Sequence, residues 1–346
     1  MRLSQTAEGL IPEIAPEFTQ FGEPFRDSPS ADFIGIWDEK KERGQEAART
    51  YGTRYWPDLA ALLDACDAVA ICSETVHHLQ LVREAAARKC HILCEKPLAT
   101  TLADCDAIET LVRDAGIAFM QSFPKRFDPI NHELRKIIDA GRLGTLALVR
   151  VRHGHFHGLE PNFHKEWFVN PALCGGGTLL DEGVHAADFL RWMFGEPESV
   201  VAMKSATTLK LPVEDAEIAV FRFPSGMLAE VCASWSFAAA NDSIEVYGTK
   251  GTVLISGVDL GSRDITAGGY LKVYEASSSD KRWSVSDVVP RFKTGGFHQQ
   301  NAINFLAALH EGKPPPIGIS DGRRALELIL AAYRSIETGH EQRIAP

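Results

Sequence analysis

The chain has 346 residues, of which 45% are hydrophobic and 24% are charged, and its formal net charge is −10. This length exceeds the size at which one hydrophobic core usually keeps growing, so we expect two packed domains of an ordinary globular enzyme. The negative charge and the lack of a dense Lys/Arg run argue against nucleic acid as a partner. Since neither an apolar run of about 18 residues nor a basic leader with an apolar core occurs, we expect no membrane span and a cytoplasmic protein.

Short apolar runs alternate with helical segments from residue 31 onward. Residues 33–37 and 67–72 are predicted to be buried strands. The alternation continues with predicted helices that end at 51 and span 78–89 and 102–115, and with predicted strands at 91–94 and 117–121. This pattern indicates βαβ units on a parallel sheet, so we predict a Rossmann-like dinucleotide-binding domain over residues 1–122.

Asp38 closes the predicted strand at 33–37. An acidic residue at that place typically accepts a hydrogen bond from the ribose 2′-hydroxyl of a dinucleotide. Its carboxylate would repel a 2′-phosphate, which favours NAD over NADP as the cofactor. The alternative is that Asp38 only caps the helix that follows.

The glycine-rich turn that should lie about 20 residues before this acidic residue is missing. The stretch offers only Gly9 and Gly22, and its four prolines leave no continuous apolar run. We therefore expect the first strand to be absent or altered. The cofactor phosphates would then be held by unusual backbone contacts, or the N-terminus would be a replaced version of the ancestral one.

Longer strands dominate after Phe123, and two helices close the chain. The strands are predicted at 146–157, 199–205, 216–223, 227–235, 243–247, 252–255 and 271–274, and the helices at 298–309 and 323–336. Residues 123–346 are thus predicted to form a substrate-binding and oligomerisation α+β domain with a large open mixed or antiparallel sheet, whose last helix can pack back on the first domain. Because an uncovered sheet face presents a broad surface, we expect a homodimer or homotetramer.

Glu95 and Lys96 follow the predicted strand at 91–94, at the edge where this type of sheet binds its ligands. A lysine there can hydrogen-bond a substrate hydroxyl and lower its pKa. Glu95 would orient Lys96 or contact the nicotinamide ribose. A surface ion pair in a loop is the alternative.

Three consecutive glycines, at 175–177, precede a predicted helix that carries Asp181 and His185. Glycine allows close approach of backbone, and residues four apart share one helical face. Histidine can take the proton of an alcohol that loses its hydride, while the carboxylate stabilises the imidazolium or touches substrate. A helix cap and a core histidine would explain the two residues equally well.

Four motifs stand at separate places in the chain. They are Glu95-Lys96-Pro97, Ser122 through Pro129, Gly175 through His185, and the turn from Glu245 to Gly251. Together they resemble the Gfo/Idh/MocA oxidoreductases, over residues 31–336. The resemblance implies that Lys96, Asp181 and His185 are catalytic, with His185 as the acid/base, in an enzyme that uses NAD or NADP.

The resemblance also implies cofactor-side residues. The loop from Ser73 to His78 is similar to a family loop that is often T-P-N-x-x-H, although Glu74 and Thr75 replace the usual Pro-Asn. Ser73, Glu74 and His78 are therefore expected to face the cofactor, as are Glu95 and Lys96. Arg126 is expected to reach cofactor or substrate, with a structural salt bridge as the alternative.

Potential metal ligands occur, but we predict no metal. Three histidines alternate over residues 153–157 and would point to one strand face, where they could join Asp181 and His185 around a transition metal. The resemblance instead implies hydride transfer without a metal, and recognition of sugar hydroxyls is the intermediate interpretation. On that basis His155 is expected to bind substrate, together with Trp167, which matches a substrate-side position. The seven cysteines lack paired zinc-ribbon spacing and are expected to be buried reduced thiols.

Two functions compete on these residues. The first is an NAD(P)-dependent dehydrogenase that transfers a hydride between nicotinamide and a hydroxyl or carbonyl of a sugar, inositol or related polyol. The second is a non-catalytic sensor or scaffold of the same fold, because the phosphate-binding turn is missing. A redox-neutral lyase or hydrolase that uses bound NAD transiently stays open, as do the identity of the substrate and the direction of the reaction.

Overall fold

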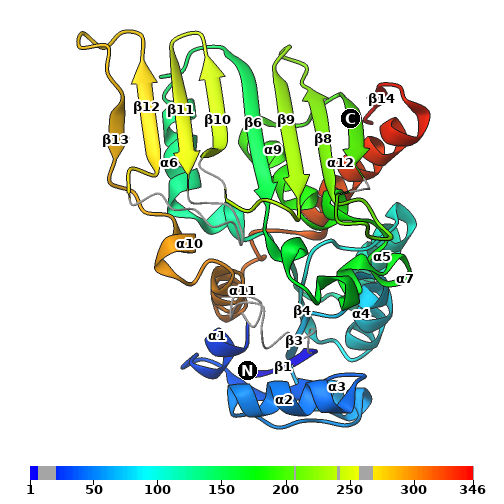
Figure 1. Cartoon of the computed structure of the whole chain (residues 1–346). Coiled ribbons are helices and arrows are strands. Elements are labelled where there is room, and N and C mark those ends of the chain that lie inside the picture. The colour runs from blue at the N-terminus through cyan, green and yellow to red at the C-terminus, as the bar shows by residue number, and fades with distance from the viewer. Residues whose placement is uncertain (7–20, 206–207, 240–241, 257–267, 346) are drawn as a thin grey trace. The chain divides into compact units, whose positions relative to one another are not determined.

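The computed structural model describes residues 1–6, 21–205, 208–239, 242–256 and 268–345. The chain divides into two compact units, each with its own sheet (Figure 1). The first unit comprises Met1–Pro124 and His298–Arg323, and the second comprises Lys125–Phe297 and Arg324–Pro346. None of the helices in the described part of the chain is both long and apolar enough to cross a membrane.

The first unit contains a five-stranded parallel sheet in the order β2-β1-β3-β4-β5. Its strands are β1 (Arg2–Thr6), β2 (Asp32–Trp37), β3 (Ala68–Ile71), β4 (His91–Cys94) and β5 (Phe119–Gln121). The helices of this unit include α1 (Gly22–Arg26), α2 (Lys41–Tyr51), α3 (Leu59–Ala65), α4 (His78–Ala87), α5 (Leu102–Ala115) and α11 (Gln299–Glu311). Because all five strands run in one direction, their carboxyl ends share one edge of the sheet, as predicted for a Rossmann-like domain.

The first strand is present, which corrects the expectation that residues 1–30 lack a central strand. β1 pairs with both β2 and β3 and therefore lies inside the sheet. It has no apolar run because polar side chains are buried beside Leu3: Ser4 Oγ donates to the Cys66 sulfur at 3.2 Å, and Gln5 Nε2 donates to the Cys72 sulfur at 3.6 Å. The position of the expected glycine-rich turn, with Gly9, lies outside the described residues.

The second unit contains a nine-stranded mixed sheet in the order β13-β12-β11-β10-β6-β9-β8-β7-β14. Its strands are β6 (Leu146–Gly154), β7 (Ser199–Ser205), β8 (Ala216–Arg222), β9 (Leu228–Ser234), β10 (Asp242–Gly248), β11 (Gly251–Ser256), β12 (Leu271–Glu275), β13 (Ser284–Ser286) and β14 (Gln342–Arg343). β6 and β9 are parallel neighbours, and the other described pairs are antiparallel. The large mixed sheet was predicted, and its presence is confirmed.

Helices of the second unit precede, interrupt and follow this sheet in the chain. They are α6 (Pro129–Asp139), α7 (Pro171–Cys174), α8 (Thr178–Asp181), α9 (Gly183–Phe194), α10 (Arg291–Thr294) and α12 (Ile319–Thr338), which begins in the first unit. α9 packs against β6 and β9, and α8 packs against β8 and β9. These contacts place the glycine-rich segment and its histidine next to the central strands.

The strand β6 ends at Gly154, earlier than predicted. His155 follows it, and His157 begins a short 3₁₀ helix that ends at Leu159. The prediction that the three alternating histidines share one strand face is therefore wrong, because only His153 belongs to the strand.

Candidate active site

Three loops of the first unit carry five of the seven residues predicted for the cofactor side. Asp38 follows β2, Ser73 and Glu74 follow β3, and Glu95 and Lys96 follow β4. Ligands of doubly wound sheets bind outside the carboxyl ends of the strands. The fold thus brings these five residues to the edge that a dinucleotide would use.

A pocket of about 380 Å³ opens at this edge beside β2 and β3. Trp37 and Asp38 line it from the end of β2, Arg43 from α2, and Glu74 and His77 from the loop and turn after β3. A carboxylate at the end of the second strand is the group that holds an adenosine ribose in dinucleotide folds. The residues present therefore fit the adenosine end of NAD.

Arg43 joins two carboxylates in this pocket. Its Nε donates to Asp38 Oδ2 at 2.5 Å, and its Nη1 donates to Glu74 Oε1 at 3.1 Å. Asp38 Oδ1 also accepts from the backbone N–H of Lys40 at 2.6 Å, just before α2 begins. Burial raises the pKa of Asp38, and the hydrogen bond from Arg43 opposes that shift. Asp38 thus bonds to the backbone of Lys40, the N-cap residue of α2, but it does not cap the helix as the alternative interpretation held. Its contact with a ribose hydroxyl stays a prediction.

His78 is buried and ties two loops of this edge together. Its Nδ1 lies 3.2 Å from the carbonyl oxygen of Leu98, and its Nε2 lies 3.0 Å from that of Ser73. Burial lowers the pKa of this imidazole. Since both ring nitrogens face backbone carbonyls, His78 holds the loops that carry Glu74 and Lys96. That it also faces the cofactor stays a prediction.

Lys96 is positioned through its main chain. Glu95 Oε2 accepts from the Lys96 N–H at 3.0 Å, and Glu95 Oε1 accepts from the Ser122 hydroxyl at 3.0 Å. Asn301 Nδ2, on α11, donates to Ser122 Oγ at 3.0 Å. These bonds give Glu95 the orienting role that was one of its two predicted roles. Ser122 and Asn301 were missed as members of this arrangement.

His298 also lies near Lys96 and was missed. Burial, together with the positive charge of Lys96, lowers the pKa of His298 to about 3. The ring is therefore neutral at physiological pH and can accept a hydrogen bond without adding a second positive charge beside Lys96.

Replacing Ser122 with alanine should misplace the loop that carries Lys96. We expect kcat to fall about tenfold, with a loss of about 1 kcal/mol in the free energy of unfolding, because one buried hydrogen bond to Glu95 and one from Asn301 disappear. Steady-state kinetics and chemical denaturation measure the two effects. Ser278→Ala, in an exposed turn, is the control, and an unchanged kcat with lowered stability would show a purely structural role.

In the second unit the three-glycine segment at 175–177 packs so closely against neighbouring residues that side chains in its place would collide with them. A Cβ on Gly177 would lie 2.1 Å from the Glu214 carbonyl oxygen, and one on Gly176 would lie 2.5 Å from the Tyr333 hydroxyl. Glu214 Oε1 accepts from the Gly177 N–H at 2.6 Å and from the Tyr333 hydroxyl. The predicted close approach of backbone is confirmed. Glu214 and Tyr333, which were missed, fix the start of the helix that carries Asp181.

Asp181 and His185 belong to two successive helices. The helical path is interrupted at Glu182, between α8 and α9, so the prediction of one regular helical face is wrong in detail. Asp181 Oδ2 accepts from the Trp235 indole N–H at 3.0 Å. His185 is 2% exposed, and its ring lies edge-on to that of His153 with centroids 5.1 Å apart. Trp235, another residue that was missed, therefore fixes the carboxylate of the pair.

Two of the histidines lie next to the carboxylate of Glu182. Its Oε2 lies 3.1 Å from His153 Nε2, and its Oε1 lies 3.6 Å from His155 Nε2. Ligand atoms of His155, Asp181 and Glu182 all lie within 4.8 Å of one another, a spacing that a metal could bridge. His155 Nδ1, however, accepts from the His157 N–H at 3.2 Å, so in the neutral ring Nε2 carries the proton.

A metal-bound histidine has the reverse arrangement, because its free nitrogen donates to a neighbouring acceptor. The geometry of His155 therefore suits a hydrogen bond to Glu182 or to a substrate hydroxyl. The absence of a metal and the substrate contact of His155 both remain predictions.

Arg126 and Trp167 pack within the second unit. The Arg126 guanidinium forms a bidentate ion pair with Asp188 on α9, with Nη2–Oδ1 at 2.6 Å and Nε–Oδ2 at 3.0 Å. Of its two interpretations, the structure shows the salt bridge. Trp167 stacks on Phe168 with ring centroids 4.2 Å apart and packs against the cluster that contains Trp235. Its contact with substrate stays a prediction.

Glu217 is a buried carboxyl group beside the glycine segment. The Thr178 hydroxyl donates to it, and burial raises its pKa from 4.5 to about 9. At neutral pH this group is protonated in the folded protein and ionised in the unfolded chain. Because the folded state binds the extra proton between these two pKa values, Glu217 makes stability fall as pH rises through that window.

Replacing Glu217 with glutamine should weaken the dependence of protein stability on pH. Glutamine keeps a neutral side chain with an acceptor for Thr178, so we expect the variant to lose less stability than the parent between pH 5 and pH 9, the window that the pKa shift sets. Urea denaturation across a pH series measures it. Glu311→Gln, at an exposed pair with Lys313, is the control; parallel curves for the parent and Glu217→Gln would contradict the assignment.

Family models match both units of the chain. A model described as an oxidoreductase family with an NAD-binding Rossmann fold matches residues 15–123, and the GFO/IDH/MocA C-terminal domain matches residues 131–254. The chain belongs to the Gfo/Idh/MocA oxidoreductase family. This confirms the predicted resemblance, the enzyme class and the NAD-binding first domain, and nothing in the comparisons favours a non-catalytic member of the family.

Curated Gfo/Idh/MocA relatives align along most of the chain. Myo-inositol 2-dehydrogenase of Thermotoga maritima is 27% identical over 87% of this chain and 88% of its own length. scyllo-Inositol 2-dehydrogenase (NAD(+)) of Bacillus subtilis is 26% identical over 90% of this chain and 88% of its own length. An oxidoreductase from Agrobacterium radiobacter, solved in complex with NAD+, L-tartaric acid and magnesium, shares the fold with a TM-score of 0.80 at 20% identity, over 99% of this chain and 98% of that chain.

Proposed function

We propose that the protein is an NAD(P)-dependent dehydrogenase of sugars, inositols or related polyols. The observation that carries this proposal is the cluster of His153, His155 and Asp181 around Glu182 in the second unit, with buried His185 against the His153 ring. Such a cluster can hydrogen-bond several hydroxyls and accept a proton. The names of the curated relatives agree with a polyol substrate.

Each residue has a role in this reaction. The Lys96 ammonium donates a hydrogen bond to the reacting hydroxyl and lowers its pKa, and the His185 imidazole takes its proton. Asp181, held by Trp235, stabilises the imidazolium that forms. The Asp38–Arg43–Glu74 pocket holds the adenosine end of the coenzyme. Bound NAD supplies the chemistry of accepting or returning a hydride.

The test is direct. The purified protein is given NAD or NADP with inositols, aldoses and sugar acids, and nicotinamide absorbance is followed while NAD binding is measured separately by calorimetry. We expect NAD to bind and at least one polyol to reduce it. NAD binding without turnover on any member of the panel would favour the non-catalytic alternative, and no binding of either coenzyme would overturn the proposal.

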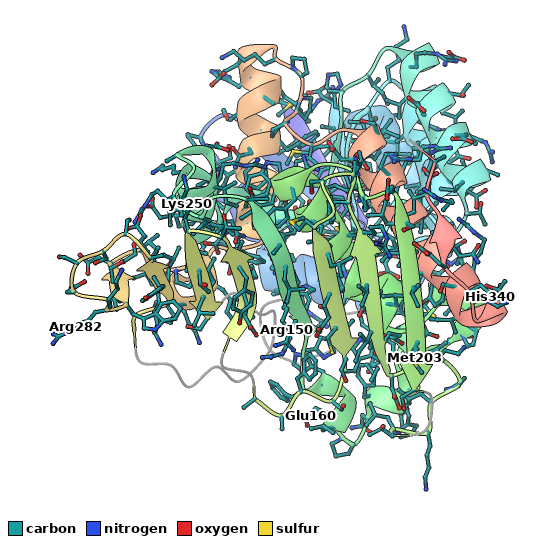
Figure 2. The ribbon with its side chains drawn as sticks, turned by 90° about the horizontal axis from the view of Figure 1, so that it is seen from above. Arg150, Glu160, Met203, Lys250, Arg282 and His340 are labelled. Carbon is teal, nitrogen blue, oxygen red and sulfur yellow. The ribbon has the colours of Figure 1, made fainter. Side chains whose placement is uncertain are left out.

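We also propose that the nine-stranded sheet forms a homodimer or homotetramer through its outer face. Apolar side chains on β7 and β8 remain exposed there: Val201 by 46%, Met203 by 76% and Ile218 by 50%. Figure 2 shows Met203 on β7, and Arg150 on the more central β6, where it pairs with carboxylates of β9 and β10. An apolar patch of this kind is typical of a protein interface.

Replacing Met203 and Ile218 together with glutamate should dissociate this assembly, because the charges would be buried without partners in the interface. Light scattering measures the mass, with Leu159→Glu as the control, since Leu159 is 52% exposed and lies outside the sheet. An unchanged mass for the double variant would contradict the proposed interface.

The proposed compartment is the cytoplasm. All seven cysteines are free thiols in the structure, including Cys66 and Cys90, whose sulfurs are 3.8 Å apart. Reduced thiols are the normal state of cysteine in a cytoplasmic protein.

A further inference from the structure

Arg43 is the positive charge of the pocket beside β2 and β3, and carboxylates hold it on two sides. The exposed fractions of the side chains are 13% for Arg43, 3% for Glu74 and 0% for Asp38, so this ion-pair chain is largely removed from water. Two of the donor nitrogens of Arg43 are bonded to these carboxylates. Its charge is thus balanced by two carboxylates, and two of its three nitrogens are already engaged.

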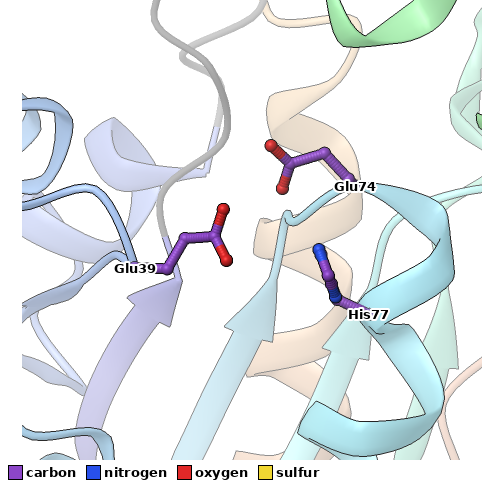
Figure 3. A group of neighbouring side chains, drawn as sticks. All are labelled: Glu39, Glu74 and His77. Carbon is purple, nitrogen blue, oxygen red and sulfur yellow. The ribbon is translucent and has the colours of Figure 1, made fainter. Parts of the chain in front are cut away.

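The surroundings of Glu74 add further negative charge. Figure 3 shows Glu39 from the segment after β2 and Glu74 and His77 from the segment after β3, with their polar ends turned toward a common space. One ligand atom from each of these three lies within 4.8 Å of the others. The exposed Lys40 ammonium lies 3.9 Å from Glu74 Oε1.

The balance of charge over the whole pocket is also negative. Five carboxylates line it, and Arg43 is the one lysine or arginine among its described lining residues; the carboxylates are those of Asp38, Glu39, Asp58, Glu74 and Glu84. The acidic excess disfavours any ligand group that brings more negative charge.

The two nicotinamide coenzymes differ in the charge that they would bring here. A phosphate monoester carries about −1.5 to −2 charges at neutral pH and binds well to a guanidinium with free parallel donors. The ribose 2′-hydroxyl of NAD is neutral and can donate to a carboxylate. A 2′-phosphate that binds Arg43 through two parallel N–H groups would compete with Glu74 for Nη1, whereas a 2′-hydroxyl that donates to a carboxylate would not.

We propose that Glu74 determines coenzyme specificity: it holds Arg43 against Asp38 and thereby excludes the 2′-phosphate of NADP. The inference rests on the proposed function, which places the adenosine end of the coenzyme in this pocket. It adds the residue that selects NAD over NADP. Glu74 acts through Arg43, so removing the carboxylate converts an excluding pocket into one with an available guanidinium.

Binding of coenzyme fragments tests the proposal without any need for turnover. Calorimetry with adenosine 5′-monophosphate and adenosine 2′,5′-bisphosphate gives the preference for the 2′-phosphate as a ratio of two Kd values. We expect the parent to favour the monophosphate, and Glu74→Gln to shift the ratio toward the bisphosphate by about tenfold or more. The same shift should appear in kcat/KM for NADP against NAD.

Two further variants make the result specific. Glu74→Gln combined with Arg43→Leu should lose the gain, because the released guanidinium is what binds the phosphate. Glu46→Gln, which removes a carboxylate from the surface pair with Arg49 on the same helix, should leave the ratio unchanged.

The outcomes separate the two proposals. If the parent binds NAD but Glu74→Gln leaves the ratio unchanged, or if the gain survives the loss of Arg43, the role of Glu74 is wrong while the proposed dehydrogenase stands. If the parent binds neither fragment and neither coenzyme, the placement of the coenzyme fails, and with it both proposals.

Discussion

Replacing Lys96 with methionine lowers kcat by about a thousandfold and leaves the fold intact. The expectation follows from the proposed role of the Lys96 ammonium in polarising the reacting hydroxyl, a contribution typical of general acid–base catalysis. The loop itself should survive, because Glu95 holds the main-chain N–H of residue 96 and not its ammonium group. Steady-state kinetics, with thermal unfolding as the check on folding, measures the effect.

The matched control is Lys41→Met, which removes an exposed lysine at the start of α2. It should leave kcat unchanged. A loss of less than about tenfold for Lys96→Met, in a folded protein that still binds NAD, would remove Lys96 from the chemistry.

We expect the replacement of His185 with glutamine to lower kcat by about a hundredfold to ten-thousandfold, because the proposed proton acceptor is lost. NAD binding should stay within about twofold of the parent, because the proposed coenzyme pocket belongs to the first unit. Since the His185 ring is buried against His153, the free energy of unfolding is measured on the same sample.

The variant Asp181→Asn tests the carboxylate that is proposed to assist His185. Asparagine can still accept from the Trp235 N–H, so the packing is retained while the charge that stabilises an imidazolium is removed. We expect a loss of about tenfold to a hundredfold in kcat. Full activity in both variants would exclude His185 as the base, and His340→Gln, in an exposed turn, controls for the loss of any histidine.

Most of the fold prediction was based on regular hydrophobic periodicity. The strand at 199–205 and the helix at 102–115 have the same bounds in the structure, because their burial alternates with the period of a strand or a helix. β1 could not be found in this way, since its buried Ser4 and Gln5 donate to thiols from distant parts of the chain. The early end of β6 was missed because the histidines beyond it continue the alternating pattern.

The candidate site was predictable where it depends on position in the fold. Lys96 lies after β4 and Asp38 after β2, as the βαβ pattern indicated. Arg43 gave no signal, because a charge on an amphipathic helix is typical of a solvated face. Trp235 bonds to Asp181 within the second unit, and Asn301 bonds to Ser122 within the first, through contacts between residues distant in sequence, which no local pattern reveals.

The central claim is that Lys96 and His185 act on one substrate beside one nicotinamide. A crystal structure with NAD+ and a polyol bound tests it most directly, because it shows which side chains approach the reacting carbon. We predict that the lysine ammonium and the histidine imidazole both lie within hydrogen-bonding distance of the same substrate hydroxyl. A bound coenzyme whose nicotinamide lies apart from either side chain would contradict the account.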